Sequence, residues 1–419
     1  MGRILIKDIY LDGKQSDILI EGNRISKIAD KIEDKFTDAT IIDGKGKAAI
    51  PGFANMHTHA AMTMMRGGKE DEKLQRWLSA IWSMEKHLDD EIVYWGTRLA
   101  CLEMIKTGTT LFNDQYFYID SAVKAASEMG VRGVHSYVFL DLNNKEMIEP
   151  QREKCIQEYE NSKSWGDMNS FAVGVHALYS VSEENIVWAF EFAKKHGLKV
   201  HIHLAETYQE LMECKGKNKC TPVEYFNSLG VISPDLIAAH CVWLSPNDIE
   251  ILGRNGVNIA HNIKSNLKLA SGLNFKFKEL SDAGANVCLG TDGTASNNNL
   301  DMLDTMQITA LVQKAWRNDP AAIPLPELMR SATYNGYKAL GLDGGRIKEG
   351  ALADLSIIDI DNYKFTPNIN FAANLVYSAN SYCIKTVICN GRIVMKDRYV
   401  EGEDEIVAQV RKLYKKLLV

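Results

Sequence analysis

The tripeptide His57-Thr58-His59 has the spacing in this chain that best suits chemistry. Residues i and i+2 of a strand point to the same side, so two imidazoles would converge on one spot. Imidazole nitrogen is the commonest side-chain ligand of metal ions in proteins. Because His-X-His triplets occur often by chance, the remaining ligands of a metal site must come from elsewhere in the chain.

Further histidines and carboxylates follow short apolar runs downstream, namely His176, His203, Glu206, His240 and Asp292. A catalytic zinc takes nitrogen and oxygen ligands and keeps one position open for water. The residues His57, His59, His203 and Asp292 would supply three imidazoles and one carboxylate. Water bound there would have a pKa of about 7, which makes hydroxide available at neutral pH.

Two more of these groups suit proton transfer. Glu206 follows His203 by three residues, which lets a carboxylate reach over the metal as a general acid/base. His240 could hydrogen-bond the same water and orient it. His201 could also point inward as a ligand, but it lies deeper in its strand and Asp292 already completes the set. We expect packing or supporting roles for His135 and His261 and solvent-exposed positions for His87 and His196.

Eight short apolar runs, most of them followed by helical pattern, could position these groups. The runs are 49–57, 109–114, 132–140, 171–178, 199–206, 236–243, 258–262 and 286–292. Segments 91–106 and 183–196 carry apolar residues at helical spacing. This alternation predicts parallel strands that close into a (β/α)₈ TIM barrel, with functional groups at the carboxyl ends of the strands. An open doubly wound sheet is the alternative, but no Gly-x-Gly-x-x-Gly follows the first strand.

Both ends of the chain read as short strands with turns, at 3–7, 16–21 and 24–28 and again at 353–359 and 384–394. We therefore expect one small β-sandwich domain from residues 1–52 and 348–419, with a last helix over roughly 403–418. Residues 53–347 would form the metal-dependent barrel.

The composition of the 419 residues narrows the class of protein. The formal net charge of −6 is spread without a basic stripe, which argues against nucleic-acid binding. No 18-residue apolar stretch predicts a membrane span, and the start lacks the pattern of a signal peptide. The eight cysteines form no framework, as expected for a cytoplasmic enzyme.

Several longer motifs resemble the amidohydrolase superfamily. They are segments 51–59, 203–206, 239–241 and 289–293. Segments 261–272 and 293–298 resemble more narrowly the branch that holds 5′-methylthioadenosine/S-adenosylhomocysteine deaminases and triazine hydrolases, and 345–355 resembles the return to the β domain. The resemblance covers nearly the whole chain.

The resemblance implies a mononuclear site with zinc, or alternatively iron, because the fourth strand offers no lysine to bridge two metals. It makes Glu206 the acid/base, His240 the water-orienting histidine and Asp292 a proton shuttle as well as a ligand. It also implies that the counterpart of His176 contacts the purine ring. Trp77 and Glu85 resemble a nucleoside-contacting stretch whose glutamate binds ribose hydroxyls. A homo-oligomer is implied by the resemblance alone.

We therefore expect hydrolytic deamination of an adenine nucleoside to the inosine analogue and ammonia. Candidate substrates are 5′-methylthioadenosine, adenosine, 5′-deoxyadenosine and S-adenosylhomocysteine. The last fits least well, because no arginine follows the third strand to bind its carboxylate, although Arg152 lies further on. The alternatives are a triazine hydrolase, a guanine or pterin deaminase, or a barrel without activity kept as a scaffold.

Overall fold

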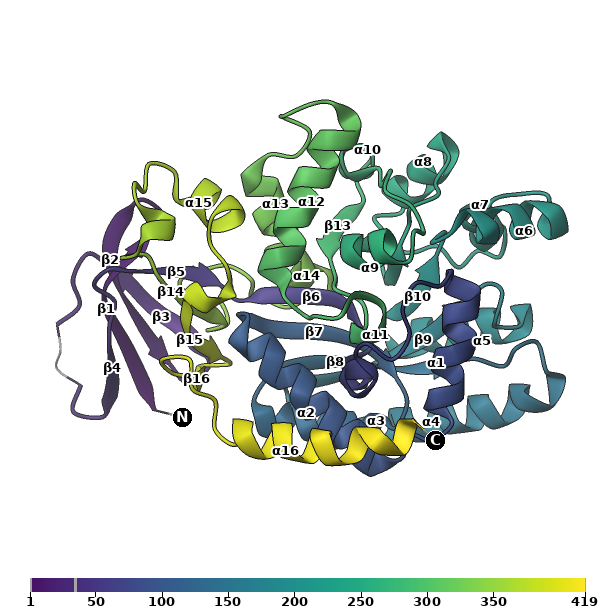
Figure 1. Ribbon diagram of the computed structural model, residues 1–419, viewed down its shortest axis with the longest axis horizontal. Helices are drawn as coiled ribbons and strands as arrows, with labels where there is room; N and C mark the ends of the chain where they lie inside the picture. The colour runs from purple at the N-terminus through teal and green to yellow at the C-terminus, as the bar shows by residue number, and fades with distance from the viewer. Residues whose placement is uncertain (1, 34–35, 419) are drawn as a thin grey trace.

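The computed structural model describes residues 2–33 and 36–418, and Figure 1 shows its two sheets side by side. In these residues the first sheet, which forms the barrel, has eight parallel strands, each hydrogen-bonded to the next in chain order. They are β6 (Phe53–Thr58), β7 (Thr109–Tyr116), β8 (Arg132–Phe139), β9 (Asn169–Ala177), β10 (Val200–Leu204), β11 (Leu236–His240), β12 (Asn258–His261) and β13 (Asn286–Leu289).

The barrel strands are buried because helices cover one face and the barrel interior covers the other. Every residue of β7, β10 and β11 is buried. Strands covered on both faces read as continuous apolar runs, and all eight predicted runs are confirmed as strands. Several end earlier than predicted, so that Glu206 and Asp292 lie on loops beyond β10 and β13.

The first predicted run, 49–57, contains parts of two strands. Residues Lys47–Pro51 form β5 of the second sheet, and β6 begins at Phe53. Gly52 joins them where the chain passes close to β7, because a Cβ at this position would lie 2.0 Å from Thr110 Oγ1. A larger residue would displace β7, and the glycine therefore marks the point where the chain leaves one sheet for the other.

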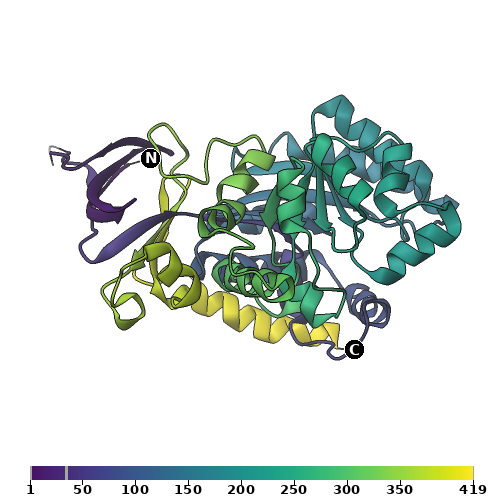
Figure 2. The same ribbon diagram turned by 90° about the horizontal axis from the view of Figure 1, so that it is seen from above.

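Helices follow the barrel strands and cover the outside of the barrel (Figure 2). The two helices predicted from spacing are present, and Ser182 caps the start of α5 by accepting the N–H of Asn185. The helices of the barrel are α1 (Leu74–Glu85), α2 (Asp90–Lys106), α3 (Ile119–Met129), α4 (Ile148–Ser162), α5 (Glu183–His196), α6 (Tyr208–Asn218), α7 (Pro222–Ser228), α8 (Pro246–Arg254), α9 (Ile263–Lys268), α10 (Phe277–Asp282), α11 (Thr294–Asn297), α12 (Met302–Arg317), α13 (Leu325–Ser331) and α14 (Tyr334–Ala339).

The segment after β13 brings the last strand of the barrel back to the first. Asp292 donates its N–H to the carbonyl of His57 at 2.9 Å. The Asn55 amide donates to Thr291 Oγ1 at 2.7 Å and accepts the Thr291 N–H at 3.0 Å. These bonds hold Asp292 beside His57, although the two residues lie far apart in the chain.

The second sheet is built from both ends of the chain, as predicted. It also has eight strands, in the order β16-β15-β14-β5-β1-β2-β3 with β4 beside β1. One apolar core receives side chains from several of these strands, among them Ile4, Ile18, Ile25, Ile357 and Ile388. The strands not yet given bounds are β1 (Arg3–Leu11), β2 (Lys14–Glu21), β3 (Arg24–Ala29), β4 (Ala39–Asp43), β14 (Leu355–Asp359), β15 (Ile384–Cys389) and β16 (Arg392–Met395).

A buried ion pair joins the two sheets. The guanidinium of Arg132, at the start of β8, lies 3.4 Å from the carboxylate of Asp354, and both residues are less than 5% exposed. Asp354 also accepts the Tyr337 hydroxyl at 2.8 Å and the N–H of Asn390 at 2.5 Å. Because its partners satisfy both carboxylate oxygens, this buried charge fixes the second sheet against the amino end of the barrel.

The last helix packs against the barrel rather than against the second sheet. Helix α16 (Glu403–Leu413) runs along α2 beneath the barrel, as Figure 1 shows in yellow. It ends five residues before the predicted Leu418, and a short 3-10 helix, η5 (Tyr414–Leu417), continues it. A further helix, α15 (Phe371–Tyr377), precedes β15.

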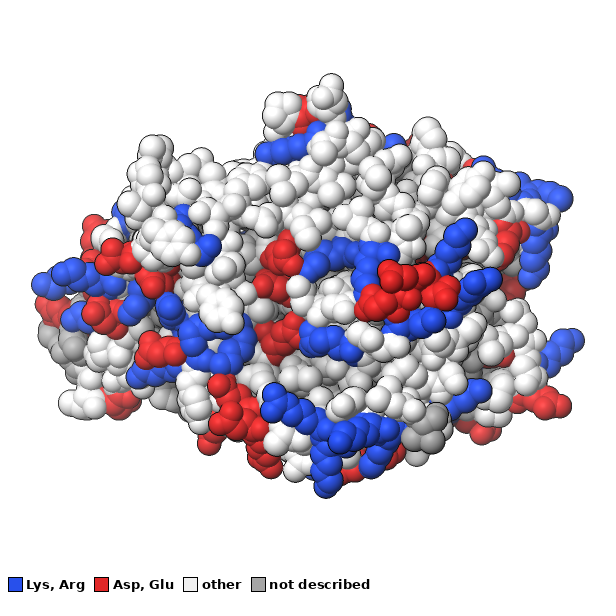
Figure 3. All heavy atoms as spheres, viewed as in Figure 1, with Lys and Arg blue, Asp and Glu red and all other residues white. Residues whose placement is uncertain are grey.

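Charged side chains of both signs are interspersed on the face seen in Figure 3. This face carries no extended basic stripe of the kind that nucleic-acid binding requires. Among the described residues, no helix combines the length and the apolar character needed to cross a bilayer.

Candidate active site

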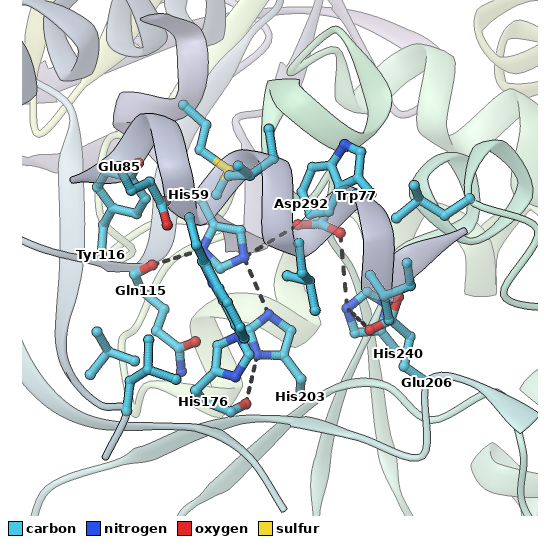
Figure 4. Close-up of a pocket in the computed structure, with 18 of the residues that line it drawn as sticks. His59, Trp77, Glu85, Gln115, Tyr116, His176, His203, Glu206, His240 and Asp292 are labelled. Atoms are coloured by element: carbon cyan, nitrogen blue, oxygen red, sulfur yellow. Dashed lines mark hydrogen bonds and ion pairs between the residues drawn. The ribbon is translucent and has the colours of Figure 1, made fainter. Parts of the chain in front are cut away.

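A pocket opens at the carboxyl ends of the barrel strands, and most of the candidate residues line it (Figure 4). Those residues are His59, Trp77, Glu85, His176, His203, Glu206, His240 and Asp292. His57 lies directly behind them, with its ring centre 4.9 Å from that of His59 and 4.8 Å from that of His203. The structure thus brings together every candidate residue named from the sequence.

Four of these side chains point their donor atoms at one another. His59 Nε2 lies 3.2 Å from His203 Nε2 and 3.4 Å from Asp292 Oδ1. His57 Nε2 lies 3.5 Å from the same carboxylate oxygen. Ligands held tetrahedrally 2.0–2.1 Å from a zinc ion lie about 3.3–3.4 Å apart. The four atoms therefore have the spacing of one coordination sphere.

Hydrogen bonds on the far side of the rings fix which nitrogen faces this centre. His59 donates its Nδ1–H to the carbonyl of Gln115 at 2.7 Å, and His203 donates its Nδ1–H to the carbonyl of His176 at 2.7 Å. Both Nε2 atoms therefore carry lone pairs when the rings are neutral. Two lone pairs facing each other at 3.2 Å repel unless a cation lies between them.

The donor set passes a direct test of fit to a metal ion. The Nε2 atom of His57 is buried and has no hydrogen-bond partner among the described residues, although such an atom is costly to leave unpaired. A divalent ion would satisfy this atom together with the neighbouring lone pairs and the Asp292 carboxylate. These residues fit a divalent metal site.

Burial also prepares these groups for a metal. It lowers the pKa of His57 to about 4 and lowers those of His59 and His203, so that the rings stay neutral as ligands must be. Burial alone would raise the pKa of Asp292, but the neighbouring imidazoles of His57, His59 and His240 hold it well below its usual range. The carboxyl is therefore ionised at neutral pH.

His201 lies behind His57 and outside the facing atoms. Its Nε2 shares a hydrogen bond with Nδ1 of His57 at 2.8 Å. This places His201 one layer deeper in the barrel, as the sequence predicts from its position in the strand. Its contact orients the His57 ring, whose other nitrogen then faces the centre.

Glu206 and His240 occupy the other side of the centre. Glu206 Oε2 lies 3.8 Å from His240 Nε2, and the same nitrogen lies 3.9 Å from Asp292 Oδ2. His240 donates its Nδ1–H to Asn266 Oδ1 at 2.8 Å, so Nε2 faces the two carboxylates. Burial raises the pKa of Glu206, which lets the carboxyl hold a proton at a higher pH than an exposed glutamate.

The chain turns sharply at the ends of these strands. Ala205, His240 and Asp292 have positive φ values of 51°, 73° and 66°, a region that residues other than glycine rarely adopt. Strained backbone of this kind persists only where the surroundings enforce it, and it clusters at functional sites. Two of these residues, His240 and Asp292, line the pocket, and Ala205 directly precedes Glu206, which also lines it.

Helix α1 supplies the wall of the pocket opposite β10 and β11. Trp77 is 5% exposed and lines the pocket, and its indole N–H has no partner among the described residues. Glu85 lies beside Tyr116 (Figure 4), and burial raises the Glu85 pKa to about 7. His176 is neutral, because burial lowers its pKa to about 3, and its ring lies edge-on to Trp82 at 6.0 Å.

The remaining histidines lie outside the pocket. His135 is bound to Asn169 Oδ1 at 2.9 Å, and His261 stacks on Phe275 at 3.8 Å, so both pack inside the fold. His87 is exposed as predicted. The prediction of an exposed His196 is wrong, because Tyr159 and Phe192 each lie 4.5 Å from its ring and leave it half-buried.

Sequence reasoning missed several residues that support the site, namely Gln115, Tyr116, Asn266, Ser271 and Glu210. Ser271 donates its hydroxyl to Glu206 Oε1 at 3.2 Å. Only Glu210 carries a local signal, the Thr207-x-x-Glu210 pattern of a helix start. The others depend on which loops meet in space, and spacing along the chain does not reveal that.

Known proteins share both the sequence and the fold. The chain is 44% identical over 408 residues to a 5′-deoxyadenosine deaminase of Methanoregula boonei, which covers 96% of this chain and 90% of that protein. It is 40% identical to 5-methylthioadenosine/S-adenosylhomocysteine deaminase 1 of Archaeoglobus fulgidus, over 95% of this chain and 93% of that protein.

Two solved structures illustrate the likeness of fold. An adenosine deaminase from Xanthomonas campestris with bound zinc has a TM-score of 0.93 and 28% identity, and covers 99% of this chain and 98% of its own. Atrazine chlorohydrolase from Arthrobacter aurescens, solved with zinc, has a TM-score of 0.90 at 24% identity and covers 98% of this chain and 100% of its own. The second likeness concerns the fold alone.

The match at the level of families spans both sheets. Residues 48–394 match the family described as the amidohydrolase family, a range that begins in β5 and ends in β16. It includes all eight barrel strands and every candidate ligand. The chain belongs to the amidohydrolase family.

Proposed function

We propose that the chain hydrolyses the amino group from the purine ring of an adenine nucleoside and releases the inosine analogue and ammonia. The observation that carries the proposal is a buried carboxylate, Glu206, whose Oε2 lies 3.8 Å from His240 Nε2 beside the candidate metal ligands. The relatives at 40–44% identity, named as deaminases of 5′-deoxyadenosine and related nucleosides, support the same reaction.

We propose zinc as the resident metal, held by His57, His59, His203 and Asp292, with iron as the alternative. Three imidazoles and one carboxylate suit zinc, and the similar adenosine deaminase from Xanthomonas campestris holds zinc. When bound there, a divalent ion lowers the pKa of a coordinated water molecule to about 7.

The protein groups would then move the protons. Asp292 takes a proton from the water that attacks the ring carbon bearing the amino group. Glu206 gives a proton to the adjacent ring nitrogen, so that negative charge does not build up there. Burial alone would lower the pKa of His240, but the carboxylates of Glu206 and Asp292 raise it. The protonated ring donates a hydrogen bond from Nε2 to the developing tetrahedral centre. Asp292 passes its proton to the amino group, and the bond between this nitrogen and the ring carbon breaks to release ammonia. The hydroxyl of the tetrahedral centre then returns a proton to Glu206, which gives the carbonyl of the inosine analogue and restores both carboxyl groups.

The α1 wall would hold the nucleoside. We propose that Glu85 accepts hydrogen bonds from the ribose hydroxyls, that Trp77 contacts the nucleoside and that His176 contacts the purine ring. Each of these side chains lines the same pocket as Glu206. The free indole N–H of Trp77 supports this role, because a buried donor without a partner suits a bound ligand.

The pocket wall favours substrates without a carboxylate at the 5′ position. Among the described residues that line it there is no lysine or arginine. Arg152, the cation considered from the sequence, instead binds Glu149 at 2.8 Å and Asn185 at 3.0 Å. We therefore propose 5′-methylthioadenosine, 5′-deoxyadenosine or adenosine as substrates in preference to S-adenosylhomocysteine.

An ammonia-release assay tests the function. The purified enzyme is loaded with zinc and given the three preferred nucleosides, S-adenosylhomocysteine, guanine, a pterin and a triazine. We expect ammonia release from the three nucleosides. The highest kcat/KM of all the compounds tested should belong to one of these three. A protein that releases ammonia from none of the adenine nucleosides does not have the proposed function.

Two further properties are proposals about the molecule as a whole. We propose that residues 1–52 and 348–419 form one domain and residues 53–347 the other. We also propose a homo-oligomer in the cytoplasm, which light scattering of the purified protein and fractionation of the source cells would test.

A further inference from the structure

The carboxylate of Glu210 lies beneath the turn that carries Glu206. Glu210 is 4% exposed, belongs to the first turn of α6 and is not among the described residues that line the pocket. Its Oε1 accepts the N–H of Ala205 at 2.9 Å, and its Oε2 accepts the N–H of Glu206 at 2.8 Å. One buried carboxylate therefore holds two successive peptide groups.

This turn needs to be held because its conformation is strained. Strand β10 ends at Leu204, and Ala205 adopts the left-handed region, in which its Cβ crowds the backbone. From the opposite side, the Ala205 carbonyl accepts the N–H groups of Val242 and Trp243 at 3.0 Å each. The turn is thus tied both to α6 and to the segment that follows β11 and His240.

The neighbouring helix α7 shows that a glutamate can cap a helix start without binding the residues that precede the N-cap. In α7 the third residue, Glu224, accepts the N–H of its own N-cap residue Thr221 at 2.9 Å. Helix α6 starts with the same pattern, and the Thr207 hydroxyl accepts the N–H of Glu210 at 3.1 Å. However, the Glu210 carboxylate reaches past Thr207 to the two residues before it. Its bonds therefore stabilise the turn rather than the end of the helix.

We propose that Glu210 is a positioning residue that holds the Ala205–Glu206 turn so that the Glu206 carboxylate faces His240 and Asp292. The proposal rests on the proposed function, in which Glu206 transfers the proton. Ser271 holds only the end of the Glu206 side chain, whereas Glu210 holds its backbone. Since a misplacement of about 1 Å can slow a reaction about 100-fold, loss of the anchor would reduce turnover.

The variant Glu210→Gln tests this role, because an amide NH₂ replaces one of the two acceptor oxygens. We expect kcat to fall about 10- to 100-fold, with KM and metal content close to those of the wild type. The matched control is Glu224→Gln, the same substitution at the start of α7, which should keep the wild-type kcat. An unchanged kcat in Glu210→Gln, or an equal fall in the control, would overturn the proposal.

A double-variant cycle shows whether Glu210 acts through Glu206. In a Glu206→Gln background, the further change Glu210→Gln should lower the residual kcat less than twofold, because the group being positioned is already disabled. A second loss as large as in the wild type would mean that Glu210 acts on the fold in general. If Glu210→Gln does not fold, the variant Glu210→Asp takes its place with the same expectations. Its shorter side chain withdraws the carboxylate oxygens from the N–H groups of Ala205 and Glu206.

Amide hydrogen exchange provides a readout that needs no substrate. The N–H groups of Ala205 and Glu206 should exchange faster in Glu210→Gln than in the wild type and remain protected in Glu224→Gln. Unchanged protection at these two positions would contradict the proposal. The two failures are distinguishable, since a wild type without deaminase activity disproves the function, whereas an active wild type with an unaffected Glu210→Gln disproves only the positioning role.

Discussion

At the scale of single residues, the four candidate ligands are placed unfavourably close to one another unless a cation lies between them. Both His59 and His203 use their one N–H on a backbone carbonyl, which leaves their lone pairs opposed. The buried Asp292 carboxylate also has no lysine or arginine as an ion-pair partner among the described residues. The four side chains are arranged to surround a cation. Because they are buried, water cannot easily stabilise them in its place.

The substitution Glu206→Gln separates proton transfer from metal binding. Glutamine keeps the shape of the side chain but cannot transfer a proton, so kcat should fall by about 10²- to 10⁴-fold. The metal content, measured by elemental analysis, should equal that of the wild type, while His203→Ala should lose the metal. A Glu206→Gln protein without metal would make Glu206 a ligand and contradict the assignment.

Glu85 should give nucleoside binding a pH dependence. Burial raises its pKa to about 7, so the carboxyl becomes protonated at a higher pH than usual. The ionised form is the stronger acceptor for ribose hydroxyls, and KM for nucleosides should therefore rise as the pH falls from 8 to 6. The KM of Glu85→Gln should be higher at pH 8 and vary less with pH. Identical pH profiles for the two proteins would exclude Glu85 as the cause.

At the scale of elements, the end of the chain supports the wall of the pocket. Leu413 and Leu417, from α16 and η5, belong to the same buried apolar cluster as Trp77 and Leu78 of α1. Through this cluster the end of the chain is connected to α1, while α16 itself packs on α2 and η5 packs on the 3-10 helix Ala60–Met65. Movement of this end of the chain would be transmitted to the side chains that we propose to contact the nucleoside.

Truncation of the two leucines should loosen that wall. The double substitution Leu413→Ala and Leu417→Ala removes buried methyl groups, and each of the two substitutions costs about 2–5 kcal/mol of stability. We expect KM for the nucleoside to rise several-fold with unchanged metal content. The control is Leu418→Ala at a residue that is 63% exposed, and it should leave KM unchanged. A KM equal to that of the wild type in the double variant would disprove this supporting role.

The pattern of apolar residues along the sequence revealed the barrel strands well, because buried parallel strands are continuous apolar runs. It did not reveal where one run splits, since Gly52 separates β5 from β6 only through the approach of Thr110. At the site, the candidate ligands could be named because their residue types are rare at strand ends. Asn266 could not, because an asparagine on a loop is common and only the folded chain places it on His240.

At the scale of the whole molecule, buried histidines outside the pocket should make the fold sensitive to acid. Burial lowers the pKa of His135 to about 4, below its ordinary value near 6.5. His135 therefore binds a proton more tightly in the unfolded chain than in the folded protein. The stabilising contribution is present above about pH 6.5 and is lost as the pH falls toward 4.

The variant His135→Gln measures this contribution, since glutamine can still donate to Asn169 and does not titrate. Between pH 7 and pH 5 the variant should lose about 2 kcal/mol less unfolding free energy than the wild type, as measured by urea denaturation. His87→Gln, at an exposed position, should show the wild-type loss. Equal losses in all three proteins would contradict the assignment to His135.

The antiparallel pairing of β5 with β14 has a consequence for biosynthesis. Ile50 pairs with Ser356, so a strand made early waits for one that the ribosome releases roughly 300 residues later. At translation rates of about 5–20 residues per second, that wait lasts roughly 15–60 s. During this time the edge of the nascent N-terminal strands is open to other chains. Aggregation during synthesis, more than the stability of the finished fold, should therefore limit the yield of this protein.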